Sequence, residues 1–382
     1  MDKRKKYETV IVGGGPSGCA CGIKLLEQNR SCCIIDKAIF PRDKVCGGLL
    51  PEKTITFIHS LMPERKKEKI QKELTIDTSK SIAFYKNNNF IVKSPTQTVF
   101  TISDRKILDN YLVEYYKKHN GIIYEGVKIT KIDFNKKIIY TNKEEFEYQY
   151  LVAADGVNSY VRKELNLKPI KKISFIEYDI EKKDFDGTDD LTFFDYKGEQ
   201  LGWSFPKGKY YNIGLGFPKK EKNAIEIMNN FLKELGVRNI EKYKRKGALL
   251  PNTDIVKPYA KDHILFVGDA GSFTEPMTGE GIFQALFSGV QAAISIINGK
   301  NVVKTYNKKT KTLRQSKRIL KHLQWFIYHC DDLALNRLKR KPYSITKMVD
   351  GHIGKRILNY NNLVSFIISY KKYNRNDKID KK

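Results

Sequence analysis

The sequence predicts an α/β fold in which strand–helix units hold an inserted antiparallel sheet and are followed by a helical C-terminus. Two patterns predict it. Short β-branched runs alternate with helical stretches over the first 160 residues and again near 263–297, whereas residues 170–220 alternate apolar and polar residues between turn signals. The chain has 382 residues, of which 41% are hydrophobic, enough to bury the core of two packed domains.

The first strand–helix–strand unit occupies about 30 residues. A strand at Tyr7–Val12 leads into a glycine turn, a helix at Cys19–Gln28 follows, and a second strand at Ser31–Ile35 ends at Asp36. Later elements follow from the same periodicities: strands in Ser81–Val92, Gly121–Tyr140, Phe146–Ala153 and His263–Val267, and helices at Asp104–Lys118, Ala224–Leu235 and Gly281–Ile297.

The turn after the first strand carries Gly13-x-Gly15-x-x-Gly18. The first glycine permits a tight turn, the second allows a diphosphate to approach the backbone, and the third allows close packing of helix on strand. The following helix directs free N–H groups and a positive dipole at the phosphates. Asp36, 18 residues after Gly18, is placed to bind ribose hydroxyls, so the unit reads as a Rossmann-type dinucleotide domain. Two neighbours complete this candidate site, Ser17 and Lys37.

A second glycine–acid element favours FAD over a nicotinamide cofactor. Gly268-Asp269 follows the strand near residue 265, and a helix starts just after Gly279 and Gly281. A second strand end with an acid, followed by a second helix start, can bind the ribityl chain and isoalloxazine of FAD, which a nicotinamide dehydrogenase does not need. The predicted cofactor is therefore FAD.

These motifs resemble the flavoprotein superfamily that includes the aromatic hydroxylases. The resemblance rests on three elements: Gly13–Gly18, Asp155-Gly156 and Gly268-Asp269. Three more segments make the chain similar to the geranylgeranyl reductase family, CbrA-like bacterial members included: Lys44-Val45-Cys46-Gly47-Gly48, Trp203-x-Phe205-Pro206-Lys207 followed by Gly214-x-Gly216, and Pro276-Met277-Thr278-Gly279-Glu280-Gly281-Ile282. The order and spacing hold over residues 7–300.

The resemblance implies the following roles. Arg105 would reach the FAD phosphate or ribityl region, and Val127 would line the adenine side. Backbone N–H groups of Gly281 and Ile282 would lie near the flavin pyrimidine ring. The remaining matches fall into two groups, Cys46 to Gly48 beside the isoalloxazine and an apolar wall over it made of Trp203, Phe205 and Pro206. Asp155 joins the candidate cofactor residues, although capping of its turn is the favoured interpretation.

The activity that the resemblance implies is reduction of C=C bonds in a prenyl-chain lipid or another long apolar substrate. Such bonds are unactivated, so a dry apolar slot over reduced flavin and a proton donor are required. Cys46 is the candidate donor, because a thiol with an ordinary pKa near 8.5 can give up a proton at neutral pH. The alternative is that Cys46 is only a small residue that fits beside the flavin. The electron donor is left open among NAD(P)H, ferredoxin and quinol.

Three other functions share the cofactor motifs. A flavin-dependent monooxygenase or halogenase would need oxygen, and the Trp-x-Trp-x-Ile-Pro run usual in halogenases of this superfamily is absent. An electron-transfer flavoprotein with a C-terminal iron–sulfur cluster is excluded, because only Cys330 lies beyond residue 46, although a cluster-free version survives. A flavin-loaded redox-sensing protein without turnover is the third.

The motifs divide the chain into parts with these predicted bounds: an FAD-binding domain at 1–80, 100–168 and 258–300, a substrate domain at 81–99 and 169–257, a basic helical region at 301–373, and a flexible tail at 374–382. No metal cluster is expected from the six scattered histidines.

Charge and cysteine usage predict the location. The net charge is +27, and residues 301–382 carry 21 Lys and Arg against five Asp, which favours an anionic membrane surface; no nucleic-acid module accompanies the charge, so nucleic acid is not the expected partner. The alternative is an ordinary helix with a solvated basic face. No secretory or spanning segment is visible, and the cysteines form no disulfide framework, so we expect a cytoplasmic protein, peripheral on the inner membrane face.

Overall fold

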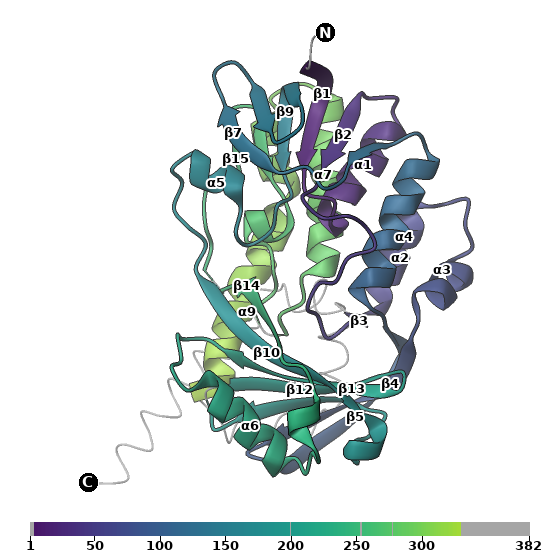
Figure 1. Ribbon diagram of the computed structural model, residues 1–382, viewed down its shortest axis with the longest axis vertical. Coiled ribbons are helices and arrows are strands. Elements are labelled where there is room, and N and C mark those ends of the chain that lie inside the picture. The colour runs from purple at the N-terminus through teal and green to yellow at the C-terminus, as the bar shows by residue number, and fades with distance from the viewer. Residues whose placement is uncertain (1–3, 199, 253, 277, 330–382) are drawn as a thin grey trace, which may run out of the picture.

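The chain folds into two sheet-bearing parts with a helical arm along one side (Figure 1). The computed structural model describes residues 4–198, 200–252, 254–276 and 278–329. Within them the predicted α/β fold with an inserted antiparallel sheet and a helical C-terminal region is confirmed. The predicted helical stretch at 330–373 and the predicted tail at 374–382 lie outside the described residues.

The first sheet brings the predicted cofactor motifs to one edge. Its strands run in the order β15–β16–β9–β1–β2–β6, and all the neighbours from β16 to β6 pair in parallel. The bounds are β1 Arg4–Val12, β2 Cys32–Ile35, β6 Ile122–Tyr124, β9 Glu145–Ala153, β15 Ala260–Lys261 and β16 Ile264–Phe266. Carboxyl ends of parallel strands meet at one edge, so the loops that begin at Gly13, Asp36, Asp155 and Gly268 converge there.

Both faces of this sheet are covered, which explains why the strands end in apolar runs such as Val10–Val12 and Leu151–Ala153, and why β2 and β16 are apolar throughout. One face packs on helices α1 (Pro16–Leu26), α2 (Glu52–Leu61), α4 (Arg105–Lys118) and α7 (Ile282–Asn298). The other face is covered by the hairpin of β7 (Ile129–Asp133) and β8 (Ile138–Thr141) and by α5 (Tyr160–Glu164). Helix α1 begins at Pro16, three residues earlier than predicted, because proline is favoured in the first helical turn.

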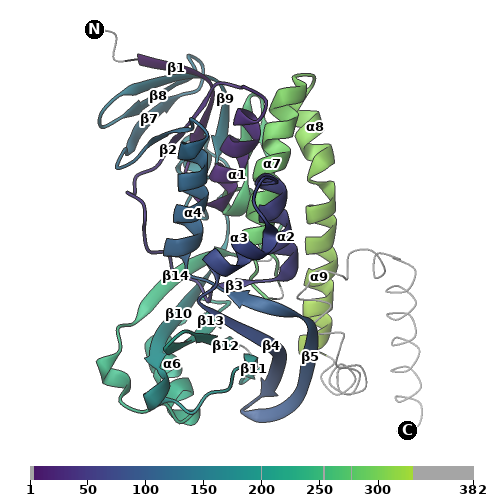
Figure 2. The same ribbon diagram turned by 90° about the vertical axis from the view of Figure 1, so that its right-hand side faces the viewer.

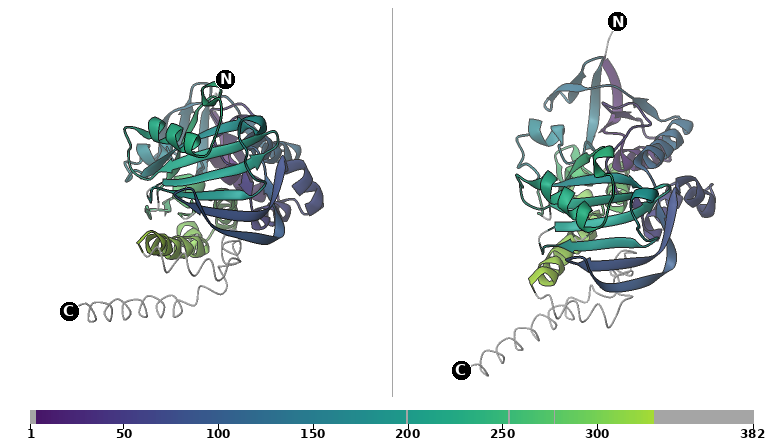
Figure 3. Two further views of the ribbon diagram at one scale, coloured as in Figure 1. Left: turned by 90° about the horizontal axis from the view of Figure 1, so that it is seen from below. Right: turned by 60° about the horizontal axis from the view of Figure 1, so that its bottom comes forward.

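The second sheet is antiparallel except for one parallel pair, β11 with β4. Its order is β14–β10–β13–β12–β11–β4–β5–β3. The bounds are β3 Leu49–Leu50, β4 Asp77–Lys86, β5 Asn89–Ile102, β10 Lys172–Glu181, β11 Leu191–Tyr196, β12 Gln200–Lys207, β13 Tyr210–Phe217 and β14 Lys246–Pro251. Helix α6 (Ala224–Glu234) lies across the outer face (Figure 3).

Strand alternation divides the second sheet's side chains between two clusters. Phe194, Ile213 and Leu215 pack under Phe231 of α6. On the opposite face, which looks toward the first sheet in Figure 1, a smaller cluster contains Phe205. The face toward the cofactor edge is therefore rich in aromatic side chains.

The predicted boundaries at 80/81 and 99/100 fall inside β4 and β5, which belong whole to the second sheet. Helices α2 and α3 (Lys67–Leu74) were not predicted. Short 3-10 turns complete the described chain: Lys182–Asp184, Ile240–Lys242 and Gly268–Gly271.

Helices α8 (Val302–Lys309) and α9 (Lys311–His329) follow α7 along the side of the molecule (Figure 2). Tyr306 of α8 is buried, and its hydroxyl donates a 2.7 Å hydrogen bond to the carbonyl of Phe266 in β16. The basic helical region is thus attached to the first sheet.

Candidate functional site

The glycine turn between β1 and α1 is as close-packed as a diphosphate site requires. Gly13 has φ of +108°, and a Cβ there would lie 2.4 Å from the carbonyl oxygen of Ala154. A Cβ on Gly18 would lie 1.9 Å from the carbonyl oxygen of Gly13. No side chain caps α1 at Gly15, so its first backbone N–H groups are available to a ligand.

Asp36, at the end of β2, is held in place by hydrogen bonds from the glycine turn and from its own loop. Its Oδ2 accepts a 2.7 Å hydrogen bond from the backbone N–H of Gly14, and its Oδ1 accepts one of 2.8 Å from Ala38. Each carboxylate oxygen has a second lone pair, so ribose hydroxyls can still bind. The buried Val127 lies beside it, with its N–H donating to the Asp36 carbonyl at 2.9 Å, whereas Lys37 is exposed.

A cluster of cations lies beside the glycine turn. Arg105 donates two 2.7 Å hydrogen bonds to the fully buried Asp109, and Arg42 reaches the same carboxylate at 3.0 Å. A Cβ on Gly15 would lie 3.6 Å from Arg42 Nη2, which places this guanidinium at the diphosphate side of the turn. The Arg105 charge lowers the pKa of the nearby Lys44. Only Arg105 was predicted; Arg42 and Lys44 are additions that the fold brings in.

The second glycine–acid element packs directly on the first. Gly268 has φ of +55°, a Cβ there would lie 2.9 Å from Ser17 Oγ, and its N–H donates to Ser288 Oγ of α7 at 2.9 Å. Asp269 accepts a 2.7 Å hydrogen bond from Thr274, and a Cβ on Gly281 would lie 3.6 Å from its carboxylate. Residues about 250 positions apart thus form one site.

The start of α7 leaves polar atoms for a ligand. Gly279 has φ of +73°, and α7 begins at Ile282, so its first N–H groups open at the end of this turn. Glu280 and Gln284 each have one buried side-chain oxygen without a hydrogen-bond partner among the described residues. Together with the two glycine turns and the cationic cluster, these donors and acceptors fit FAD, which when bound would be held by both elements.

The Cys46–Gly48 segment connects the cofactor edge to the second sheet. Gly48 has φ of +84°, and its carbonyl accepts a 2.8 Å hydrogen bond from Ser103. A Cβ on Gly47 would lie 3.0 Å from the Phe205 ring and 3.3 Å from Trp203 Nε1. The Cys46 sulfur accepts a 3.4 Å hydrogen bond from the Gly48 N–H.

Pro206 is the exception among the predicted wall residues. It lies opposite Tyr211, whose ring is in the cluster under α6. Adjacent residues on a strand point to opposite faces, so Pro206 lies on the outer face, away from Trp203 and Phe205. The prediction that it lines the wall is wrong for this reason.

Asp155 has the geometry of a turn cap. Its Oδ2 accepts a 3.1 Å hydrogen bond from the Val161 N–H at the start of α5, and burial raises the pKa of this carboxyl. A Cβ on Gly13 would lie 3.2 Å from the Asp155 backbone nitrogen, so its backbone borders the glycine turn.

The basic residues of α9 divide between two faces. Arg314 lies over the Tyr259 ring, and Lys317 donates to the carbonyl and hydroxyl of Ser272 at 2.6 and 3.0 Å. Arg318 is exposed. Part of the predicted basic surface therefore faces the protein and attaches α9 to it. Among the described helices, none is long and apolar enough to cross a membrane.

Comparison with known proteins identifies this architecture. The family model described as FAD binding domain matches residues 6–297. An uncharacterized protein of Methanosarcina barkeri is 31% identical over 300 residues, covering 77% of this chain and 75% of that protein. A geranylgeranyl diphosphate reductase of Rhodobacter capsulatus is 25% identical over 376 residues, 90% of this chain and 93% of that one. A digeranylgeranylglycerophospholipid reductase of Methanocaldococcus jannaschii is 27% identical over 311 residues, 75% of each chain.

Solved structures agree on the fold. A geranylgeranyl bacteriochlorophyll reductase-like protein from Thermoplasma acidophilum superposes with a TM-score of 0.70 at 18% identity, covering 91% of this chain and 99% of that one. A flavin-dependent brominase gives 0.76 at 16% identity, covering 97% and 100%. The chain therefore belongs to the FAD-binding flavoproteins of the geranylgeranyl reductase family, is an FAD-dependent oxidoreductase, and has FAD as its cofactor.

Proposed function

We propose that this oxidoreductase reduces C=C bonds of a prenyl or similar isoprenoid lipid. The observation that carries the proposal is the contact of Gly47 with the rings of Trp203 and Phe205. It joins the segment expected beside the flavin to an aromatic face, which suits a long apolar chain laid over the cofactor. Relatives are named as reductases of geranylgeranyl diphosphate and of digeranylgeranylglycerophospholipid, and these names supply the substrate class.

The chemistry requires the protein to position the chain and to exclude water. FAD, when bound and reduced, supplies the two electrons and the hydrogen for one alkene carbon. Phe193 packs edge-on against Phe205 with ring centroids 5.2 Å apart, and Phe175 packs on Trp203 at 5.7 Å. These rings supply a dry wall that favours one chain orientation. Cys46 is a candidate for giving the proton to the other carbon.

We expect the prenyl chain to be part of a membrane lipid, and the protein to bind the anionic surface of the inner membrane face. The exposed basic residues of α9 support this, although the inward ones do not contribute. The electron donor stays open among NAD(P)H, ferredoxin and quinol.

An anaerobic experiment tests the proposal. The purified FAD-loaded protein is photoreduced, geranylgeranyl diphosphate or digeranylgeranylglycerophospholipid is added, and flavin absorbance is followed while products are weighed by mass spectrometry. Reoxidation of the flavin with a product heavier by one pair of hydrogens is the expected result. Flavin that stays reduced until oxygen enters would reject prenyl reduction and favour a monooxygenase.

A further inference from the structure

A row of three residues crosses the aromatic face of the second sheet. Trp203 of β12 lies opposite Gly214 of β13, and Gly214 lies opposite Glu177 of β10. Directly opposed residues point to the same face, so Glu177 and Trp203 share it. A Cβ on Gly214 would lie 2.0 Å from Trp203 Cζ2, so the indole ring covers Gly214. A carboxyl group therefore stands directly beyond the predicted wall.

Asn212 ties the indole to Asp179, the next acid on the same face of β10. Its Oδ1 accepts a 2.7 Å hydrogen bond from Trp203 Nε1, and its Nδ2 donates one of 2.8 Å to Asp179. Interaction with the Asn212 side chain also lowers the pKa of Glu177. One amide thus fixes the indole ring relative to Asp179, two residues from Glu177 on the same strand.

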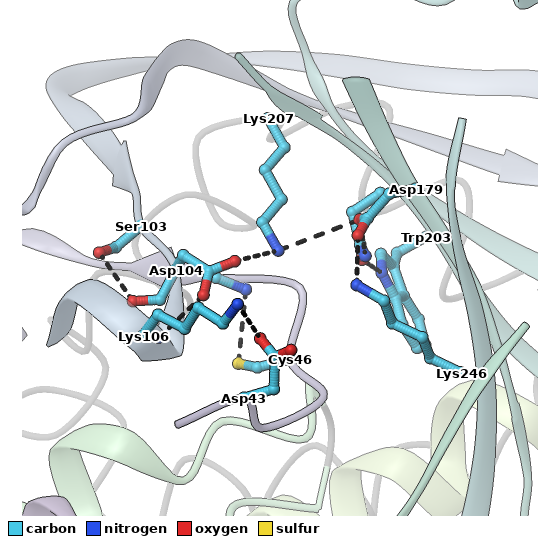
Figure 4. A network of polar contacts seen from close by, with 11 residues as sticks. Asp43, Cys46, Ser103, Asp104, Lys106, Asp179, Trp203, Lys207 and Lys246 are labelled. Atoms are coloured by element: carbon cyan, nitrogen blue, oxygen red, sulfur yellow. Dashed lines mark hydrogen bonds and ion pairs between the residues drawn. The ribbon is translucent and has the colours of Figure 1, made fainter. Parts of the chain in front are cut away.

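Two lysines extend the cluster in opposite directions (Figure 4). Lys207 of β12 lies 3.1 Å from Asp104 and 4.0 Å from Asp179, and Figure 4 shows its ammonium group between the two carboxylates. Asp104 caps α4, directly before Arg105 of the cationic cluster. Lys246 of β14 lies 2.6 Å from Asp179. The cluster reaches from the cofactor edge to the far edge of the sheet.

Glu177 is the buried acid of this cluster, with 2% of its surface exposed. Burial raises its pKa to about 7, while the charges of Lys207 and Lys246 lower it and that of Asp179 raises it. At neutral pH the carboxyl therefore exists in both protonation states. A general acid works best when its pKa lies near the working pH.

A pocket of about 420 Å³ opens from solvent onto the outer end of the cluster. Its lining includes Asp179, Lys246, Tyr210 and Tyr243. The pocket gives protons from bulk water a way to Asp179 and Lys246, at the outer end of the cluster.

We propose that Glu177, in place of Cys46, is the general acid that protonates the alkene. This rests on the proposed function. The lipid chain lies along Trp203 and meets the carboxyl beyond it. The Glu177 O–H bond breaks, a C–H bond forms on the alkene carbon that does not receive hydrogen from reduced FAD, and the π bond is consumed. The carboxylate that is left takes a proton from water through the pocket, so each turnover consumes one solvent proton.

The test compares the wild-type holoenzyme with Glu177→Gln, which keeps the size and polarity of the side chain. Reduced enzyme is mixed anaerobically with geranylgeranyl diphosphate from below to above pH 7, and reoxidation is timed. The wild-type rate should fall as pH rises through about 7, because the acid loses its proton. The variant should be slower by about 100-fold or more and lack this fall. Glu226→Gln, at an exposed position of α6 that does not line this pocket, is the control and should behave as wild type.

Infrared spectroscopy supplies a second readout that needs no substrate. The oxidised wild-type protein should have a protonated-carboxyl band that disappears across about pH 7 and is missing in Glu177→Gln. If neither geranylgeranyl diphosphate nor digeranylgeranylglycerophospholipid reoxidises the reduced wild-type enzyme, the proposed function is rejected. If the wild-type enzyme turns over and the rate of Glu177→Gln falls with pH in the same way, only the assignment of Glu177 is rejected. A protonated-carboxyl band that the substitution leaves unchanged would also reject that assignment. A variant that is slower but keeps this fall would mean that Glu177 acts only by positioning its neighbours in the row.

Discussion

The two sheets of this protein present their functional groups in different ways. The first sheet offers backbone groups. Glycines at 13, 18 and 268 bring N–H groups and strand ends within reach of a dinucleotide, and a side chain at any of them would collide with neighbouring backbone or with Ser17. The second sheet offers side chains, namely aromatic rings and a buried polar row ordered by cross-strand register. The candidate cofactor site therefore depends on short local motifs, whereas the proposed substrate wall depends on the pairing of strands.

The largest effect on cofactor binding is expected from Gly18→Ala. Its Cβ would lie 1.9 Å from the carbonyl oxygen of Gly13, so the turn or α1 must shift. Overpacking of this kind costs about 1–3 kcal/mol, and we expect the Kd for FAD to rise by about 5- to 150-fold. Titration of the apoprotein with FAD measures it. Gly247→Ala, whose Cβ would meet only the Phe175 carbonyl at 3.5 Å, is the control, and equal affinities would refute the role of the turn.

The second sheet should respond in the opposite way to Gly214→Ala. The new methyl group would overlap the Trp203 ring and displace it from the row. Small misplacements of positioning groups cost about 100-fold in rate, so lipid-dependent reoxidation should fall by about that factor. FAD affinity should stay within about twofold. A variant that loses FAD and turnover together would mean that the two sheets do not divide the work.

Local spacing is enough to predict the positions of the glycine turns, Asp36 and Asp269, because each depends on its own neighbours along the chain. That these residues bind FAD stays a prediction. Arg42 and Lys44 could not be predicted, because their charges matter only after the loop that follows β2 folds back over the turn. Glu177 in an alternating strand resembles an ordinary solvent-facing acid until the register of β10 with β13 is known.

Pro206 teaches the same point from the other side. The Trp-x-Phe-Pro motif was interpreted as one block of wall, but strand alternation sends its last member to the α6 face. The basic run of α9 also has two faces, which composition alone does not separate.

Lys317 joins α9 to the loop that carries Asp269, through a buried ammonium group. Burial lowers its pKa to about 8, whereas an unfolded lysine has about 10.5, so between these values the unfolded state binds more protons. Stability should therefore rise with pH there, by about 2 kcal/mol between pH 8 and pH 10. Urea unfolding of wild type against Lys317→Met measures this. A difference between the two proteins that does not change over this range would contradict the buried-ammonium interpretation.

The smallest expected effect concerns the membrane. Arg318 is exposed, whereas Arg314 is bound to Thr310 and to the carbonyl of Asn307. A basic residue near an anionic surface contributes about 1 kcal/mol, so Arg318→Gln should weaken binding to phosphatidylserine-containing vesicles by about fivefold. Arg314→Gln should change vesicle binding less, because its charge faces the protein. Co-sedimentation at low salt measures both. Equal losses would mean that net charge alone governs attachment, and no loss in either would place the membrane contact elsewhere on the protein.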